Sequence, residues 1–202
     1  MKTKGIFLTA IFCAMTATFI AWGIGYISIK NISQPLKYEV GQPIDEYNNV
    51  TVYYNGNVSN VGGRNLAPDG YNLGLKYQCV EFVKRYYYEY FNHKMPNSYG
   101  HAKDFFNSKV KDGQWNSDRA LLQFKNGGNY KPQANDLIIW DGNQWNPFGH
   151  VAIVYEVTDS EVKIIQQNPG PSASSRISID YTNSNNSFTI QDEEILGWLR
   201  KK

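Results

Sequence analysis

The stretch GHVAIVYEVTDSEVKIIQQN, residues 149–168, decides the fold. Both of its halves are rich in β-branched residues and they flank the turn signal Thr158-Asp159-Ser160, so strands are predicted over 150–157 and 162–168. With a loop of three or five residues, paired residue numbers sum to 318 and His150 faces Asn168. A loop of two or four residues gives 319 and puts the two side chains on opposite faces. An odd loop length would therefore bring His150 and Asn168 together.

Upstream of this hairpin the pattern is helical. Apolar residues at steps of three and four predict an amphipathic helix from Gln78 to Phe91, and two shorter helices are expected at 101–108 and 117–124. Further strands are predicted at 137–140, 176–179, 188–190 and 195–199. Helices that precede a mostly antiparallel sheet indicate an α+β fold, in which the N-terminal helices pack on the sheet.

The N-terminal segment predicts a membrane anchor. Residues 5–29 carry no charge, and about 20 apolar residues suffice to span a ~30 Å hydrocarbon layer. We therefore expect one transmembrane helix within residues 1–29, a tether over 30–44 and a domain over 45–202; a cleaved signal peptide is the alternative for the first segment. Lys2 and Lys4 favour a cytoplasmic N-terminus, which places the domain on the periplasmic or extracellular side.

Composition excludes several classes of protein. The 202 residues hold 20 Lys and Arg against 18 Asp and Glu, a net charge of +2, so there is no basic excess to track nucleic-acid phosphates. Two cysteines, Cys13 and Cys79, cannot form a disulfide framework. The three histidines lack the close ligand pairs of zinc sites, so no metal and no cofactor is expected.

Cys79 is the candidate nucleophile. It opens the amphipathic helix, where unpaired backbone N–H groups and the helix dipole favour a thiolate. The neighbouring Gln78 could donate a hydrogen bond to a developing oxyanion, together with the backbone N–H of Cys79. The alternative is a buried structural cysteine, and position alone does not decide between the two.

His150 is the candidate base. It enters a strand directly after a loop, where a side chain can reach an open cleft, whereas His93 follows a helix and His101 opens one. The carboxamide oxygen of Asn168 could accept the proton of one ring nitrogen of His150 and leave the other nitrogen toward Cys79. The alternative for Asn168, which precedes Pro169-Gly170, is a plain turn at the end of a strand.

Three motifs in order resemble the CHAP family, the cysteine, histidine-dependent amidohydrolases and peptidases. They are QCVEFV at 78–83, GHVAIV at 149–154 and QQN at 166–168. The chain is similar in particular to the amidase domain of bifunctional glutathionylspermidine synthetase/amidase, over nearly all of residues 50–200.

The resemblance implies a papain-like fold and a thioester mechanism. In it Cys79 attacks an amide carbonyl, His150 acts as base and then acid, and Asn168 or Gln166 orients the imidazole. Many relatives carry Asp or Glu where this chain has Gln166, and a neutral amide cannot stabilise imidazolium as a carboxylate does. Asn168 is therefore the preferred third member, with Gln166 as a supporting residue.

Four further side chains are candidates for substrate binding. Glu81 and Arg85, four residues apart on a helix, either form an ion pair or face the cleft. Trp140 and Trp145, with Phe148, either form an aromatic wall for substrate or pack the sheet.

We expect a cysteine amidase or peptidase that cleaves an amide bond in peptidoglycan. Glutathionylspermidine is the alternative substrate, and a catalytically weak cell-wall-binding module is the alternative of a different class. The expected partners are the peptidoglycan or peptide-amide substrate and, through the N-terminal helix, the membrane.

Overall fold

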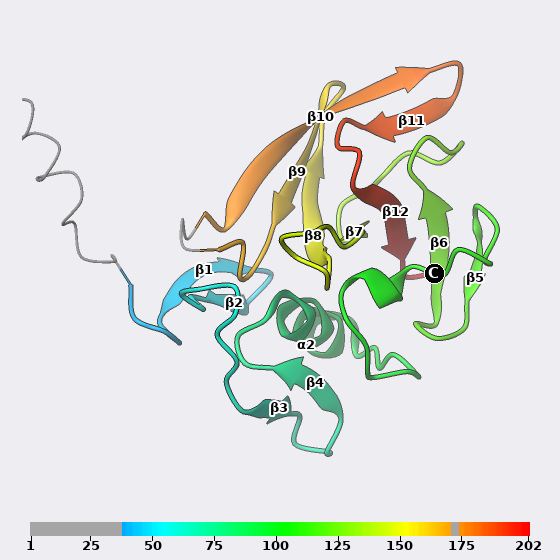
Figure 1. Cartoon of the computed structure of the whole chain (residues 1–202). Coiled ribbons are helices and arrows are strands. Elements are labelled where there is room, and N and C mark those ends of the chain that lie inside the picture. Colours follow the sequence, from blue (N-terminus) through cyan, green and yellow to red (C-terminus); the bar gives the residue numbers. More distant parts are fainter. Residues whose placement is uncertain (1–37, 171–173) are drawn as a thin grey trace, which may run out of the picture. The chain divides into compact units, whose positions relative to one another are not determined.

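The computed structural model describes residues 38–170 and 174–202, and within them an antiparallel sheet of eight strands dominates (Figure 1). Its strand order is β11-β10-β9-β8-β7-β12-β6-β5, and two separate hairpins, β1-β2 and β3-β4, complete the strands. The strands are β1 (Pro43–Tyr47), β2 (Val50–Tyr53), β3 (Arg64–Leu66), β4 (Asn72–Leu75), β5 (Gln114–Asn116), β6 (Leu121–Lys125), β7 (Leu137–Trp140), β8 (His150–Val157), β9 (Glu161–Ile165), β10 (Arg176–Ser184), β11 (Ser187–Ile190) and β12 (Ile195–Arg200).

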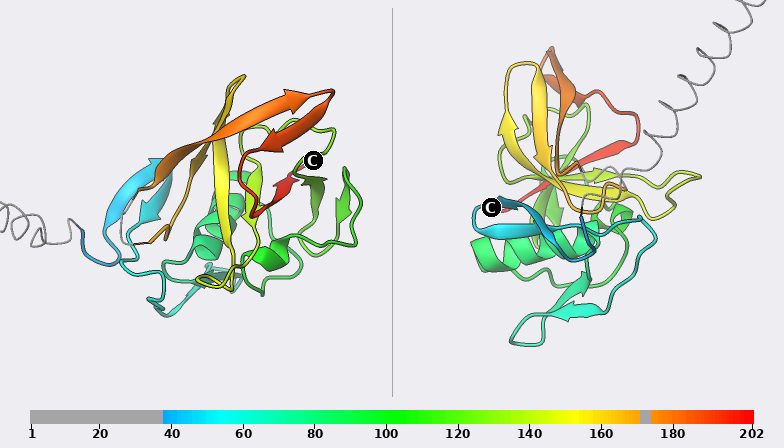
Figure 2. Two further views of the ribbon diagram at one scale, coloured as in Figure 1. Left: turned by 45° about the horizontal axis from the view of Figure 1, so that its top comes forward. Right: turned by 90° about the vertical axis from the view of Figure 1, so that its left-hand side faces the viewer.

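One α-helix, α2 (Cys79–Phe91), packs against the sheet and against both hairpins. In the right-hand view of Figure 2 it lies below the strands of the sheet, and the β3-β4 hairpin lies beneath it. Its inward residues, such as Phe82 and Tyr86, meet Ile139 and Val151 from the sheet in one core cluster. The helix therefore starts next to the end of the sheet where β8 begins.

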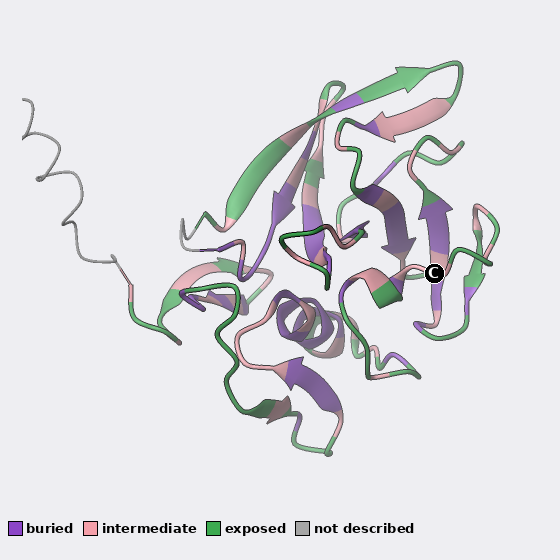
Figure 3. Cartoon of the chain, viewed as in Figure 1, coloured by how far each residue is buried: buried purple, intermediate pink, exposed green. Residues whose placement is uncertain are grey.

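The opposite face of the sheet carries a second core. Alternation along β7 and β8 sends Ile138, Ala152 and Val154 to this side, where they pack with Ile164 and Trp198. Figure 3 shows the result as buried strands in the middle of the sheet and exposed residues along β10, which lies next to the edge strand β11. Because both faces of the central strands are covered, the sequences of β7 and β8 contain continuous apolar runs.

The α+β fold class with several N-terminal helices was a wrong expectation. Most of the regular structure in the described residues is β-sheet, and the predicted helix at 101–108 is one 3-10 turn, η1 (Lys103–Phe105). The predicted helix at 117–124 is instead the turn before β6 and most of that strand. Ala120 has a left-handed φ of 53°, which stops a helix there, and the backbone after it pairs with β12.

The predicted membrane-spanning segment, residues 5–29, lies outside the described residues. Over residues 38–170 and 174–202, no helix combines the length and the apolar composition needed to cross a lipid bilayer. The compact unit begins at Tyr38, and Gly41 already donates a backbone hydrogen bond to Tyr54. The last residues of the predicted tether, 38–44, are thus part of the fold.

The β8-β9 hairpin has the expected register at one end only. Near the tip Val157 pairs with Val162, a sum of 319, but a register shift between Val154 and Glu156 makes the sum 318 from Val154↔Ile164 onward. A bulge, and not an odd loop length, therefore produces the predicted pairing. β9 then ends at Ile165, before it reaches Asn168.

Candidate active site

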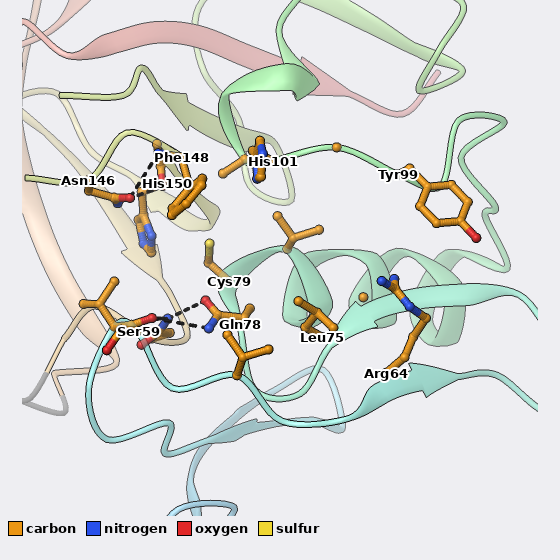
Figure 4. Close-up of a pocket in the computed structure, with 18 of the residues that line it drawn as sticks. Ser59, Arg64, Leu75, Gln78, Cys79, Tyr99, His101, Asn146, Phe148 and His150 are labelled. Carbon is orange, nitrogen blue, oxygen red and sulfur yellow. Dashed lines mark hydrogen bonds between the residues drawn. The ribbon is translucent and has the colours of Figure 1, made fainter. Parts of the chain in front are cut away.

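A cleft of about 510 Å³ opens where α2 begins. It is lined by residues from the 58–64 segment, the end of β4, the start of α2, residues 98–102 and 146–150, and Asn168. Figure 4 shows the Cys79 sulfur and the His150 ring in the same cleft, brought together from α2 and β8. The two residues, 71 positions apart in the chain, thus share one cavity, which is large enough for a peptide-sized ligand.

Cys79 is the first residue of α2, and it is 8% exposed. The N-cap residue Gln78 makes no side-chain cap, so the first backbone N–H groups of the helix are free of that partner. The backbone N–H groups of Val151, Val80 and Cys79 are close to the sulfur and favour its charged form. Burial outweighs these contacts and raises the pKa of the thiol to about 11, so Cys79 rests as a neutral thiol and not as the expected thiolate.

His150 is the first residue of β8 and pairs with Trp140 of β7. The chain enters the strand through Gly149, whose φ is 72° and where a Cβ would lie 2.4 Å from the Trp140 carbonyl oxygen. Only glycine fits at position 149, so the position of His150 depends on Gly149. The ring centroids of Trp140 and His150 are 5.5 Å apart, so the indole packs beside the imidazole.

The proton of His150 is placed by Gln166. The His150 Nε2 lies 2.9 Å from Gln166 Oε1, and Gln166 Nε2 donates to the Ser174 carbonyl oxygen at 3.2 Å. Because the amide nitrogen is committed to Ser174, the amide oxygen faces the ring, and Nε2 of His150 carries the proton. Nδ1 is left as the basic nitrogen. Burial lowers the pKa of His150 to about 4, although the hydrogen bond to Gln166 opposes the shift.

The expected third member, Asn168, does not orient the imidazole in this structure. Asn168 has a left-handed φ of 58°, so the chain turns away from His150 after β9. Its Nδ2 donates instead to Gln78 Oε1 at 2.7 Å and to the Val58 carbonyl oxygen at 3.3 Å. The structure thus reverses the expected roles, with Gln166 at the histidine and Asn168 in a supporting contact.

Gln78 is held by the same network. Its Nε2 donates to the carbonyl oxygens of Asn60, at 2.6 Å, and Val58, at 3.3 Å. Both amide hydrogens are therefore used, which is at odds with the expected donation to an oxyanion. The backbone N–H groups at the start of α2 are the donors that remain at the sulfur.

Glu81 and Arg85 lie in the interior and do not line the cleft. Arg85 Nε donates to Glu81 Oε1 at 2.6 Å, and the Glu81 side chain is fully buried. Gln167 Nε2 and Asn65 Nδ2 also donate to this carboxylate, each at 2.8 Å. The ion-pair alternative describes these residues, and neither of them is among the residues that line the cleft.

The expected tryptophan wall is also absent from the lining of the cleft. Trp140 is buried in the second core and donates from Nε1 to Asp192 at 2.8 Å, while Trp145 is 87% exposed. The aromatic side chains that do line the cleft are Phe148, Tyr99 and the imidazole of His101, whose ring is 4.7 Å from that of Phe148.

Sequence reasoning missed Tyr99 and Arg64 altogether. Neither belongs to a catalytic motif or to a periodic pattern, and both reach the cleft only because the β3-β4 hairpin and the 98–102 segment fold over α2. In the part of the chain that the structure describes, no group of three His, Cys, Asp or Glu side chains is arranged to hold a metal ion.

Comparisons with known proteins agree with the geometry. The family model described as CHAP domain matches residues 69–168, a range that contains Cys79, His150 and Gln166. The chain is 31% identical over 147 residues to the bifunctional glutathionylspermidine synthetase/amidase of Escherichia coli (strain K12), covering 67% of this chain and 23% of the relative. It is 33% identical over 106 residues to the trypanothione synthetase of Crithidia fasciculata, covering 52% of this chain and 16% of the relative. The chain thus spans less than a quarter of either of these relatives.

Proposed function

We propose, from the premise that residues 69–168 form a CHAP domain, that this protein is a cysteine-dependent hydrolase of amide bonds. The observation that carries the proposal is the shared cleft, which Cys79 and His150 both line, together with the Gln166 contact that occupies Nε2 of His150 and leaves Nδ1 as the basic nitrogen. The relatives' printed names include an amidase, which agrees with this class of reaction.

The first step begins from a neutral thiol and a neutral imidazole. Because the pKa of Cys79 is about 11 and that of His150 about 4, a resting ion pair is disfavoured. The proton therefore moves from Sγ to Nδ1 as the sulfur attacks the carbonyl carbon, in general-base catalysis. The C=O bond becomes a C–O⁻ bond, and the backbone N–H groups of Cys79 and Val80 are the donors nearest to the new charge.

The second step releases the amine. The oxyanion collapses, the C–N bond breaks, and the proton on Nδ1 of His150 passes to the leaving nitrogen, which leaves a thioester on Cys79. A water molecule then gives a proton to Nδ1 and attacks the thioester carbonyl. Collapse of this second intermediate breaks the C–S bond, releases the carboxylic acid and returns the proton to sulfur.

The substrate that we favour is a peptide amide of peptidoglycan. Arg64 lines the cleft and no Asp or Glu side chain does among the described residues, so the cavity favours acidic substrates. Peptidoglycan stem peptides carry free carboxylates. Such a substrate implies that the domain acts on the outer side of the cytoplasmic membrane, in the periplasm or at the cell exterior.

The second candidate substrate is glutathionylspermidine. It is supported by the similarity to proteins whose printed names contain that compound. Its spermidine part carries two ammonium groups, for which the cleft offers no lining carboxylate. We therefore rank it below peptidoglycan.

Digestion of purified peptidoglycan by the full-length protein tests the proposal. The products are identified by mass, and glutathionylspermidine is incubated in parallel. Wild type and Cys13→Ala, which removes the other cysteine of the chain, should release new amine and carboxyl ends, and Cys79→Ala should release none above background.

Each result leads to a different conclusion. Equal digestion by wild type and Cys79→Ala would contradict cysteine catalysis. Retention of wild type and Cys79→Ala on peptidoglycan, with no products from either compound, would establish the binding-module alternative. Cleavage of glutathionylspermidine alone would keep the mechanism and replace the substrate.

A further inference from the structure

Arg64 lies at the end of the cleft away from His150. Figure 4 shows Arg64 and Tyr99 at one end of the cavity and His150, Gln78 and Ser59 at the other, with Cys79 and Leu75 between them. Arg64 is the only lysine or arginine among the described lining residues, and no acidic side chain lines the cavity. The cleft therefore has one permanently charged group, and it is distant from the reacting atoms.

The Arg64 guanidinium is oriented but not neutralised. Its Nη1 donates to Asn72 Oδ1 at 2.9 Å, and its Cζ lies 5.6 Å from the centroid of the Tyr99 ring. Among the described residues, Nη2 and Nε of Arg64 make no hydrogen bond, and no carboxylate forms an ion pair with it. Two donor groups of an exposed, oriented guanidinium are thus free, and a guanidinium edge matches the two oxygens of a carboxylate.

The groups that orient Arg64 are themselves fixed. Asn72 Nδ2 donates to the Ser98 carbonyl oxygen at 2.9 Å, and the buried Lys84 ammonium donates to the carbonyl oxygens of Asn72 and Ser98. Arg119, also buried, donates to the carbonyl oxygens of Asn97 and Tyr99. The support of Arg64 is thus tied to backbone by two buried cations, so binding there costs little further ordering.

Lys84 and Arg119 also make the electrostatic potential around Arg64 more positive. Burial, reinforced by the charges of Arg119 and Arg64, lowers the pKa of Lys84 to about 7. The effect of Arg64 on Lys84 shows that their charges interact across this support. An anion bound at Arg64 would relieve that repulsion, whereas a cation would add to it.

We propose that Arg64 is a specificity-determining residue that anchors a free carboxylate of the substrate while Cys79 attacks an amide several bonds away. This inference rests on the proposed hydrolase function and narrows its substrate class to amides that carry such a carboxylate. Two sources share this chemistry, because peptidoglycan stem peptides and glutathionyl conjugates both contain a γ-linked glutamyl residue with a free α-carboxylate.

The test separates binding from turnover. The full-length Cys79→Ala variant is titrated calorimetrically with a stem peptide, L-Ala-γ-D-Glu-L-Lys-D-Ala amide, and with its isoglutamine counterpart, in which only the α-carboxylate is replaced by a carboxamide. A second pair consists of glutathionylspermidine and its α-carboxamide. The same titrations are made with Arg64→Gln added, and with the exposed and remote Lys111→Gln as a control that removes an equal charge.

We expect the carboxylate probe of at least one pair to bind about tenfold or more tightly than its carboxamide, as charge-assisted hydrogen bonds predict. Arg64→Gln should bring this ratio close to one, and Lys111→Gln should leave it unchanged. The probe pair that shows this preference for the carboxylate identifies whether the substrate is a stem peptide or a glutathionyl conjugate. With Cys79 intact, Arg64→Gln should raise KM for the preferred probe by a similar factor.

The outcomes distinguish this inference from the proposed function. If the carboxylate and carboxamide probes of both pairs bind equally well, the role of Arg64 is overturned, even where wild type cleaves the probes. The same holds if the preference for the carboxylate probe persists in Arg64→Gln. A ratio that depends on Arg64, without cleavage of any probe by wild type, supports the carboxylate site and overturns the hydrolase proposal. Failure of all four probes to bind overturns the inference. An unchanged melting temperature shows that Arg64→Gln folds.

Discussion

At the scale of single residues, the orientation of His150 depends on a neutral amide. Gln166 fixes which nitrogen of the ring carries the proton, but its oxygen bears no full charge to balance an imidazolium. Burial of His150 acts in the same direction, since it lowers the pKa of the ring to about 4. The residue pair therefore provides orientation without strong stabilisation of the charged intermediate.

Replacement of Gln166 tests whether it orients His150 without stabilising the imidazolium. In Gln166→Glu a carboxylate would face Nε2 and raise the pKa of His150, so the acidic limb of the kcat/KM profile should move to higher pH. In Gln166→Ala the ring loses its orienting acceptor, and kcat should fall by about 100-fold or more with little change in KM. The measurements are pH–rate profiles and an NMR titration of the His150 ring.

Melting temperatures of both Gln166 variants provide the control for folding. An acidic limb that stays in place in Gln166→Glu, together with an unchanged kcat in Gln166→Ala, would show that Gln166 does not act through His150.

The sequence was sufficient to predict the element starts at which Cys79 and His150 lie, but not the partners of their side chains. Both belong to motifs whose positions, at a helix start and a strand start, the periodicity reveals. The choice between Gln166 and Asn168 depends on where β9 ends and on the left-handed turn at Asn168, and neither follows from alternation of side chains. Arg64 depends on how a separate hairpin packs, which has no local signal.

At the scale of elements, α2 is held at its start by a buried polar network. Glu81 accepts from Arg85, Gln167 and Asn65, and Arg85 donates in turn to the Thr51 carbonyl oxygen at 2.8 Å. The network joins the helix to the residue before Asn168 and to β2. The position of Cys79 thus depends on a carboxylate that never contacts the cleft.

Glu81→Ala should therefore destabilise the fold strongly. It leaves the Arg85 charge buried without a carboxylate partner, and removal of one member of a buried pair costs about 3–5 kcal/mol. Glu156→Ala is the matched control, because Glu156 pairs with Lys163 at the surface, where the cost is about 0–1 kcal/mol. Chemical denaturation measures both. Equal costs for the two variants would mean that burial of the Glu81 pair has no energetic consequence.

Elements with an unbroken pattern were predicted within a few residues. The helix expected from Gln78 to Phe91 is α2, and the strands expected at 137–140 and 150–157 are β7 and β8. The segments at 101–108 and 117–124 are short, and their capping residues also suit turns. In the second segment, residues 121–125 pair with β12, and this contact between distant parts of the chain decides that a strand forms.

At the scale of the whole molecule, the last strand of the chain lies in the interior of the sheet. β12 lies between β7 and β6, and Arg200 at its end donates to both carboxylate oxygens of Asp136, at 2.7 and 2.6 Å. β7 in turn carries β8, which begins at His150. Since the catalytic histidine proposed here belongs to the same cooperative sheet, its protonation is linked to global unfolding.

Global stability should therefore fall at mildly acidic pH because of His150. Its pKa is about 4 in the folded protein and about 6.5 in the unfolded chain, so the unfolded state binds the proton first as the pH falls. The stabilisation is complete above pH ~6.5 and is lost as the pH drops toward ~4, by up to about 3 kcal/mol, and by less because solvent reaches part of the ring. The measurement is the free energy of unfolding across this range for wild type and His150→Gln, with the exposed Lys111→Gln as a control. The advantage of wild type over His150→Gln should shrink as the pH falls, while the difference between wild type and Lys111→Gln stays nearly constant. A difference between wild type and His150→Gln that does not change between pH 6.5 and 4 would show that the imidazole titrates alike in both states, in spite of its partial burial in the fold.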